Sequence, residues 1–223
     1  MIDHTKLGPN VSNADIDKII EEAKIYNFKS VCINPIFVKK AKKALKDTDV
    51  AVCTVIGFPT GAHEPEVKLM EARLAVLSGA DELDMVININ ALKESNYDLV
   101  LDEIKGVVNM AEGRVVKVII ETCFLTKEEI IKACNIAVEA GATFVKTSTG
   151  FGTGGATLDD VKLMKETVKD KALVKASGGV RTYEDALKMI EAGASRIGTS
   201  NGVNIVQKEG NKNDSNATYW TKR

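Results

Sequence analysis

Residues 139–147 read Glu139-Ala140-Gly141-Ala142-Thr143-Phe144-Val145-Lys146-Thr147, which is typical of a helix end followed at once by a strand. A glycine at this place supplies the left-handed residue with which many helices end. The same kind of helix-ending glycine recurs at Ser78-Gly79-Ala80 and at Glu191-Ala192-Gly193-Ala194. The chain is therefore expected to repeat one kind of helix-to-strand junction.

Working outward from these junctions, we expect eight strands, at residues 2–7, 29–33, 50–56, 82–87, 115–121, 143–147, 172–176 and 195–198. The stretch 115–120, Val-Val-Lys-Val-Ile-Ile, is almost continuously apolar, as in parallel strands that are covered on both faces. Helical periodicity fills the segments between the strands, and four of these segments open with a capping residue and an acid three positions later. The four pairs are Ser12 with Asp15, Thr126 with Glu129, Thr157 with Asp160, and Thr182 with Asp185.

Strand and helix thus alternate through the chain, and its 223 residues allow about 28 for each of eight units. We predict an α/β fold, a single-domain (β/α)8 TIM barrel over residues 1–206, with a doubly wound open sheet as the alternative. Residues 207–223 are polar and lack periodicity, so they are predicted to form a mobile tail. Tyr219 and Trp220 in this tail are interpreted as a loose terminus or an inter-subunit contact, with a flap over a site as the alternative.

The composition of the chain argues against several classes of function. The 30 Lys and Arg residues against 31 Asp and Glu give a formal charge of −1, without the basic excess that nucleic-acid binding needs. No stretch approaches the ~18 apolar residues of a membrane span, and the start lacks the apolar region of a secretion signal. Four cysteines without a CxxC pair predict reduced thiols, no metal site and a cytoplasmic location.

Two lysines interrupt apolar strand patterns. Lys146 in Phe144-Val145-Lys146-Thr147-Ser148 and Lys175 in Leu173-Val174-Lys175-Ala176-Ser177 align as apolar-Val-Lys-x-Ser. On neighbouring strands, about 5 Å apart, both ammonium groups would point into the barrel at the same height. Burial and the like charge both lower a lysine pKa, so one of the pair becomes a neutral amine that can attack a carbonyl. The alternative is that these lysines reach the barrel rim or pair with carboxylates.

Asp84, within Glu82-Leu83-Asp84-Met85-Val86, is a third ionisable residue inside a strand. Its carboxylate can move protons directly or through water, and an ion pair with a strand lysine is compatible with that role. Lys117 is interpreted mainly as the partner of Glu121 or Asp84.

Glycine-bearing segments follow the last two strands. Ser177-Gly178-Gly179-Val180-Arg181 and Ile197-Gly198-Thr199-Ser200-Asn201 stand where barrels bind phosphate. Bare glycines let backbone N–H groups approach an anion, and Arg181, Thr199 and Ser200 can donate further hydrogen bonds. These segments predict a phosphorylated ligand.

Gly150-Phe151-Gly152-Thr153-Gly154-Gly155 satisfies the G-x-G-x-x-G pattern of dinucleotide-binding folds. It falls at the sixth unit instead of the first, and the next strand does not end in an acid for the ribose hydroxyls. We therefore interpret it as a mobile loop beside Lys146, with nicotinamide binding as a weaker alternative.

Taken in order, these motifs closely resemble those of the deoxyribose-phosphate aldolase family. The matching stretches are Ile2-Asp3-His4-Thr5, Val31-Cys32-Ile33-Asn34-Pro35, Glu82 to Asn88, Phe144 to Phe151, Lys175 to Arg181, and Arg196 to Ser200. Phe151 departs from the pattern, since some members have a lysine there.

The resemblance implies a metal-independent, cofactor-free class I aldolase. Such an enzyme reversibly cleaves 2-deoxy-D-ribose 5-phosphate into acetaldehyde and D-glyceraldehyde 3-phosphate. Lys146 would form the Schiff base, Lys175 would lower its pKa, and Asp84 would assist proton transfer. Gly178, Gly179, Arg181, Gly198, Thr199 and Ser200 would hold the phosphate, and Asp3, Cys32 and Thr149 are weaker candidates for residues lining the site.

Three alternatives stay open at this point. Another Schiff-base lyase of phosphosugars would use a ketone donor, a nicotinamide oxidoreductase would bind the dinucleotide, and a non-enzymatic barrel would only bind the phosphosugar. The expected partners are small molecules, and association into a homo-oligomer is not decided by these residues.

Overall fold

The computed structural model of the chain describes residues 1–210, with side chains through Gln207. Eight parallel strands close into a barrel in which each strand pairs with its sequence neighbours and β8 pairs with β1. The strands are β1 (Ile2–Lys6), β2 (Ser30–Ile33), β3 (Ala51–Ile56), β4 (Glu82–Val86), β5 (Val115–Ile119), β6 (Phe144–Lys146), β7 (Leu173–Ser177) and β8 (Arg196–Thr199). The predicted TIM barrel is confirmed, and the open-sheet alternative is wrong.

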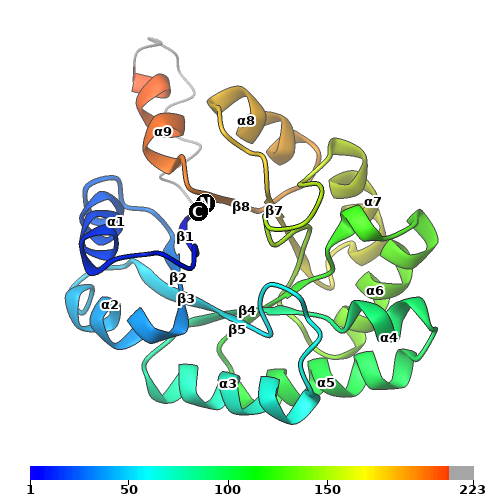
Figure 1. The fold of residues 1–223 in the computed structure, drawn as a ribbon. Coiled ribbons are helices and arrows are strands. Elements are labelled where there is room, and N and C mark those ends of the chain that lie inside the picture. The colour runs from blue at the N-terminus through cyan, green and yellow to red at the C-terminus, as the bar shows by residue number, and fades with distance from the viewer. Residues whose placement is uncertain (211–223) are drawn as a thin grey trace.

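Helices surround this barrel (Figure 1). They are α1 (Asn13–Ile25), α2 (Val38–Ala44), α3 (Pro65–Leu77), α4 (Ile89–Lys93), α5 (Tyr97–Met110), α6 (Lys127–Glu139), α7 (Leu158–Val168), α8 (Tyr183–Glu191) and α9 (Gly202–Gly210), with 3-10 turns η1 (Pro35–Phe37) and η2 (Thr122–Phe124). Within residues 1–210, no helix is long and apolar enough to cross a bilayer.

The predicted helix boundaries follow from local chemistry. Ser12, Thr126, Thr157 and Thr182 each cap a helix, and each side-chain oxygen accepts a hydrogen bond from the backbone N–H three residues on. At the other ends, the glycines of the three repeated junctions have φ values of 98°, 86° and 114° for Gly79, Gly141 and Gly193. These conformations are costly for residues with a Cβ, so the glycines end the helices and lead the chain into the next strand.

The last helix differs from the expectation. α9 runs through Gly210, so the division expected after residue 206 falls inside a helix, and the Gln207 side chain donates a hydrogen bond to the Tyr26 hydroxyl at 2.7 Å. Residues 211–223 of the expected tail, including Tyr219 and Trp220, lie outside the described residues. The domain division therefore stays a prediction.

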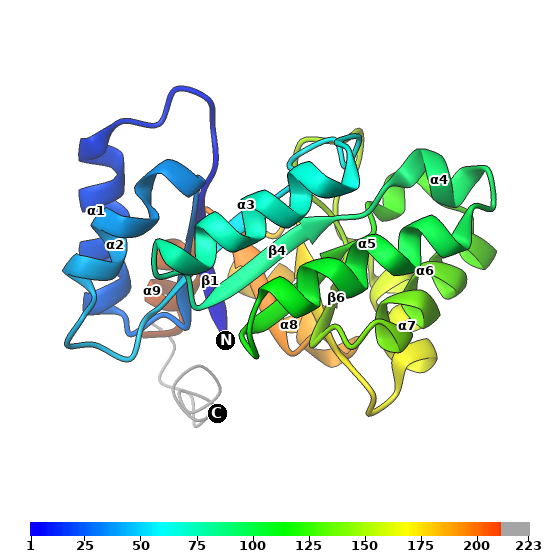
Figure 2. The same cartoon turned by 90° about the horizontal axis from the view of Figure 1, so that it is seen from below.

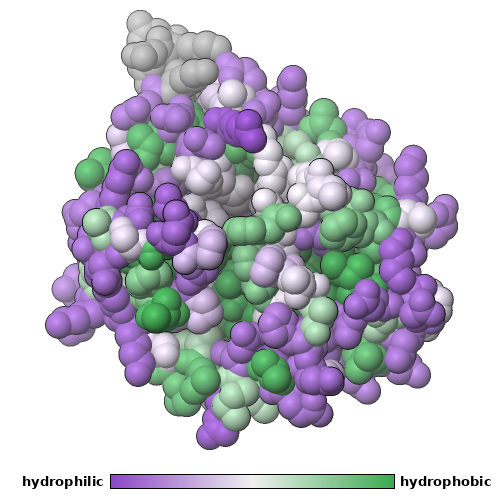
Figure 3. Space-filling model, in the orientation of Figure 1, coloured by the Kyte–Doolittle hydropathy of each residue, from purple (hydrophilic) through white to green (hydrophobic). Residues whose placement is uncertain are grey.

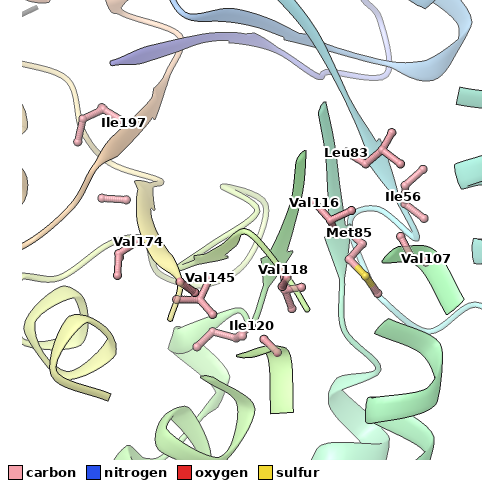
Figure 4. Packing of buried hydrophobic residues seen from close by; sticks show 14 of the residues in the cluster. Ile56, Leu83, Met85, Val107, Val116, Val118, Ile120, Val145, Val174 and Ile197 are labelled. Carbon is pink, nitrogen blue, oxygen red and sulfur yellow. The ribbon is translucent and has the colours of Figure 1, made fainter. Parts of the chain in front are cut away.

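The hydrophobic core lies between the strands and the helical ring. Leu83 and Met85 of β4, and Val116 and Val118 of β5, belong to this buried cluster (Figure 4). In the space-filling view, hydrophilic side chains dominate the periphery and paler or apolar ones gather nearer the middle (Figure 3). The loops that follow β1, β3 and β6 lie at one edge of the barrel, opposite the N-terminus (Figure 2). This edge is where the carboxyl ends of all eight strands meet, and it is where barrel enzymes carry their sites.

Candidate active site

Strand alternation brings the ionisable residues into the barrel. Neighbouring side chains of a strand point to opposite faces, so the positions between Leu83 and Met85, and between Val116 and Val118, face inward. These positions hold Asp84 and Lys117, which are register partners on β4 and β5. Both side chains are fully buried, so each needs a charged partner within the barrel.

Lys146 and Lys175 are register partners on β6 and β7, as the aligned motifs predict. Their ammonium groups converge on one oxygen, because Lys146 Nζ lies 2.7 Å and Lys175 Nζ 2.8 Å from Oδ2 of Asp84. The predicted alternative, in which the strand lysines pair with a carboxylate, therefore also holds. The three residues form one hydrogen-bonded group.

This group is part of a larger buried ion cluster. Lys175 also contacts Asp3 at 2.6 Å, Lys117 contacts Glu82 at 2.6 Å and Asp84 at 2.8 Å, and Arg196 contacts Asp3 at 2.7 Å and Glu82 at 2.9 Å. Four cationic side chains thus face three carboxylates, which leaves one positive charge in excess when all of them are ionised. The members of this ion cluster are Asp3, Glu82, Asp84, Lys117, Lys146, Lys175 and Arg196.

The cluster corrects the expected electrostatics of Lys175. Burial lowers the pKa of this lysine, but the carboxylates of Asp3 and Asp84 outweigh burial, and the pKa lies above its ordinary value. Burial raises the pKa of Asp84, but three lysines outweigh it and hold the pKa well below its usual range. The expectation that burial and the like charge lower the pKa of either strand lysine does not hold for Lys175, because a sequence pattern does not show the two carboxylates beside it.

Lys117 pairs with Asp84 and Glu82, so Asp84 is the correct one of its two expected partners. The other, Glu121, instead accepts hydrogen bonds from Thr149. Burial lowers the pKa of Lys117, but Asp84 and the other acidic groups raise it well above the ordinary value. Lys117 is therefore a fixed positive charge beside Asp84.

A cavity of about 370 Å³ opens at the carboxyl ends of the strands, next to the ion cluster. Lys146 lines it, together with Thr149 and Phe151 from the loop that follows β6. The cavity is also lined by every predicted phosphate-binding residue, namely Gly178, Gly179, Arg181, Gly198, Thr199 and Ser200. The structure thus brings the predicted lysine and the predicted phosphate segments to one cavity.

Other predicted site residues lie deeper. Asp3, Cys32, Asp84 and Lys175 are fully buried and do not line the cavity. Asp3 and Cys32, the weaker candidates for residues lining the site, thus lie inside the barrel and not at this cavity, because their strand positions put them there. Lys146, with 3% of its surface exposed, is the cluster member that reaches the cavity.

The glycines around the cavity serve packing as well as access. A Cβ on Gly198 would lie 2.9 Å from Cε of Lys175, so the bare backbone of β8 gives the lysine stem its space. Gly178 and Gly179 have φ values of 86° and 83°, which favour glycine. The Thr199 hydroxyl donates to the Val180 carbonyl at 2.7 Å, and this bond ties the two segments together.

The loop with the dinucleotide-like pattern has a structural explanation. A Cβ on Gly155 would lie 2.3 Å from the carbonyl oxygen of Gly178, so this glycine lets the loop pack on the turn after β7. Ala156 N–H donates to the carbonyls of Ser177 and Gly178 at 3.1 and 2.9 Å. The loop is held against the cavity wall by these contacts, which nicotinamide binding does not require.

Cys32, Cys53 and Asp84 have potential metal-ligand atoms within 4.8 Å of one another. The Lys117 ammonium already contacts Cys53 Sγ at 3.3 Å and Asp84 Oδ1 at 2.8 Å. A metal ion would have to displace this lysine, and the residues present do not fit one.

Sequence reasoning missed Glu82, Arg196 and Ser177 as parts of the site. Glu82 and Arg196 belong to the ion cluster, and Ser177 lines the cavity with a buried hydroxyl that lacks a partner among the described residues. The signal that identifies them is the two-residue period with which side chains of a strand point to the same face. Glu82 lies two positions before Asp84, Arg196 two before Gly198, and Ser177 two after Lys175.

Fold and site together define a (β/α)8 barrel with a lysine at a cavity next to a buried ion cluster. The model of the DeoC/LacD family of aldolases matches residues 1–208, and the chain belongs to this family. A deoxyribose-phosphate aldolase of Carboxydothermus hydrogenoformans is 64% identical over 211 residues, which cover 93% of this chain and 92% of the relative.

Solved structures agree with this assignment. The crystal structure of a protein from Coccidioides immitis has a TM-score of 0.92 and 44% identity, and the match covers 94% of this chain and 84% of that one. The deoxyribose phosphate aldolase from Aeropyrum pernix, described as having a unique tetrameric structure, has a TM-score of 0.87 and 35% identity over 94% of this chain and 89% of that one.

Proposed function

We propose that the chain reversibly cleaves 2-deoxy-D-ribose 5-phosphate into acetaldehyde and D-glyceraldehyde 3-phosphate, through a Schiff base on Lys146. One observation carries the proposal. The cluster lysine with the fewest carboxylate contacts is also the one that faces the cavity with the phosphate segments. The name of the relative that is 64% identical supports the choice of substrate.

Lys146 is the residue best suited to react. Among the described residues its ammonium contacts one carboxylate, Asp84, whereas Lys175, Lys117 and Arg196 each contact two or more. The cluster has one positive charge in excess, so a neutral amine at Lys146 leaves three cations facing three carboxylates. The neutral amine attacks the substrate carbonyl, and loss of water gives the iminium ion.

Cleavage then follows from the electron demand of the iminium ion. The hydroxyl on the third carbon loses its proton, the bond between the second and third carbons breaks, and its electron pair forms an enamine on Lys146. D-glyceraldehyde 3-phosphate leaves at this step. Protonation of the enamine carbon and hydrolysis of the iminium ion release acetaldehyde and restore the amine.

Asp84 and Lys175 are proposed to serve this cycle without leaving the barrel interior. Asp84 stays a carboxylate, since its pKa lies well below the usual range, so it can orient the Lys146 nitrogen and a water molecule that carries protons to and from it. Lys175, held by Asp3 as well, keeps its positive charge beside Lys146. A neighbouring cation of this kind is a recognised feature of Schiff-base lysine sites.

The phosphate is proposed to lie against the segments that follow β7 and β8. Gly178 and Gly179 expose backbone N–H groups, and Arg181 supplies a positive charge at the cavity. Gly198, Thr199 and Ser200 line the same side. The volume of about 370 Å³ lies within the range of small-molecule sites.

The reaction is tested by incubating the chain with 2-deoxyribose 5-phosphate and measuring acetaldehyde release. We expect turnover without added metal and in the presence of a chelator. In the condensation direction, acetaldehyde should serve as donor and dihydroxyacetone should not. Condensation with dihydroxyacetone alone would instead favour the ketone-using class of Schiff-base lyases, and no reaction with either donor would contradict the proposal.

Self-association into a homo-oligomer is part of the same proposal, and the tetrameric description of the Aeropyrum pernix relative supports it. A cytoplasmic location stays a prediction from the sequence.

A further inference from the structure

Glu121 is a buried carboxylate that the ion cluster does not include. It lies two residues after the end of β5, 2% of its surface is exposed, and no cation pairs with it among the described residues. Its φ and ψ angles are 55° and 66°, in the left-handed region that residues with a Cβ seldom adopt. A buried carboxylate in an unfavourable backbone conformation calls for a specific set of partners.

Three of the hydrogen bonds to Glu121 come from one residue of the cavity wall, and the Cys123 thiol adds a longer one to Oε1 at 4.0 Å. Thr149 donates its backbone N–H to both carboxylate oxygens of Glu121, at 3.1 and 3.3 Å, and its hydroxyl donates to Oε2. The loop comes close enough for these bonds because Gly152 has no side chain, since a Cβ there would lie 3.3 Å from Cδ of Glu121. Glu121 therefore fixes both the backbone and the side chain of Thr149.

These hydrogen bonds leave the Thr149 hydroxyl able to accept a further hydrogen bond but not to donate one. A carboxylate can only accept, so the single hydroxyl proton of Thr149 is committed to Glu121. Phe151 N–H donates to the same hydroxyl oxygen at 3.0 Å, which occupies one of its two acceptor positions. One acceptor position of the Thr149 hydroxyl is therefore left, and Thr149 lines the cavity together with Lys146.

We infer that Glu121 is a positioning residue that holds Thr149 as a hydrogen-bond acceptor for a hydroxyl group of the substrate. The inference rests on the proposed function, in which the substrate bears hydroxyl groups between the carbon that reacts with Lys146 and the phosphate. Acetaldehyde has no hydroxyl group. Glu121 thus supports recognition of the hydroxylated substrate and is not required for enamine formation from acetaldehyde.

The test compares two reactions of the same protein. Exchange of the methyl hydrogens of acetaldehyde in D2O reports enamine formation on Lys146, and cleavage of 2-deoxyribose 5-phosphate reports use of the hydroxylated substrate. We expect Glu121→Gln and Thr149→Val each to lower the ratio of cleavage to exchange about tenfold, the size of one lost hydrogen bond. The double variant should be no worse than either single variant, because both act through the same contact.

Thr122→Val is the matched control. Thr122 follows Glu121 directly, is 3% exposed, and has a hydroxyl without a partner among the described residues. Its replacement by the isosteric valine should leave the ratio unchanged. Thr149→Ser, which keeps the hydroxyl, should keep most of the ratio that Thr149→Val loses.

Two results would overturn the inference while the proposed function stands. In one, Glu121→Gln lowers exchange and cleavage equally, which would indicate a general structural role. In the other, the effects of Glu121→Gln and Thr149→Val multiply in the double variant. A wild-type chain that neither exchanges nor cleaves would contradict the proposed function itself, and the inference with it. If Glu121→Gln does not fold, Thr149→Val and Thr149→Ser supply the same comparison with Glu121 intact.

Discussion

Lys146 and Lys175 lie side by side on β6 and β7 and hydrogen-bond the same oxygen of Asp84, at 2.7 and 2.8 Å. Their other contacts differ. Lys175 is also held by Asp3 at 2.6 Å and is fully buried, whereas Lys146 reaches the cavity. Two lysines of almost identical sequence context are thus assigned different roles by their neighbours.

Replacing Lys175 tests the division of roles. Lys175→Leu removes the positive charge that shares Asp84 with Lys146 and lies beside the reacting nitrogen. We expect kcat to fall on the order of 100-fold at neutral pH. Wild-type kcat in a folded Lys175→Leu variant would contradict this role. Lys171→Leu, which removes an exposed lysine just before β7, is the control.

Gly198 tests whether the backbone of β8 makes room for Lys175. In Gly198→Ala the new Cβ would lie 2.9 Å from Cε of the lysine and 3.0 Å from Cβ of Ser177. We expect the free energy of unfolding to fall by about 1–3 kcal/mol, as in other overpacked sites. Turnover should fall with it, because Lys175 would shift away from Asp84. Urea denaturation and steady-state kinetics measure both effects, and wild-type values for both would rule out this packing.

Arg181 tests the phosphate assignment. Arg181→Met removes the cavity's exposed guanidinium, and we expect KM for 2-deoxyribose 5-phosphate to rise about tenfold through the loss of a charge-assisted hydrogen bond. Activity on unphosphorylated 2-deoxyribose should stay the same. Lys188→Met, on the exposed surface of α8, is the matched control. Equal losses with both sugars would place the phosphate elsewhere.

The buried ion cluster also predicts how stability depends on pH. Lysines hold the pKa of Asp84 well below its ordinary value, so the native state resists protonation that the unfolded chain accepts. The stabilisation is fully present above the unfolded pKa near 4 and is lost as pH falls toward the native pKa. Each such carboxylate contributes a slope of about 1.4 kcal/mol per pH unit in this acid window.

Asp84→Asn removes one of these contributions and leaves buried lysines with less compensation. We expect its free energy of unfolding at pH 7 to be lower by about 3–5 kcal/mol, and its decline between pH 4 and pH 2 to be less steep than in wild type. Urea denaturation at several pH values measures both quantities. An unchanged acid slope would mean that Asp84 does not resist protonation. Asp3→Asn offers the same comparison if the Asp84 variant does not fold.

Much of the fold could be predicted because it depends on local signals. The glycine junctions at Gly79, Gly141 and Gly193 and the capping residues such as Ser12 act within a few residues of the chain. The match between Lys146 and Lys175 was predictable for a related reason, since parallel strands that follow one another share a register. The end of α9 at Gly210 was not predicted, because the polar sequence there shows little helical periodicity.

The electrostatics of the site could not be predicted in the same way. Asp3 and Arg196 are far apart in the chain, and the closure of β8 against β1 brings them to 2.7 Å. A pattern that indicates two neighbouring lysines does not show how many carboxylates surround them, so the expected lowering of a lysine pKa does not hold for Lys175. Glu121 was considered only as a partner for Lys117, because its bonds to Thr149 depend on the course of a loop.

The central claim is that Lys146 forms the covalent intermediate, and trapping tests it most directly. The protein is incubated with 2-deoxyribose 5-phosphate, reduced with borohydride, digested and mapped by mass spectrometry. We predict one stable adduct on the Lys146 peptide, a two-carbon adduct when the trapped imine is that of acetaldehyde, and its loss in Lys146→Ala. An adduct on Lys175 instead, or none in a protein that turns over the substrate, would contradict the account.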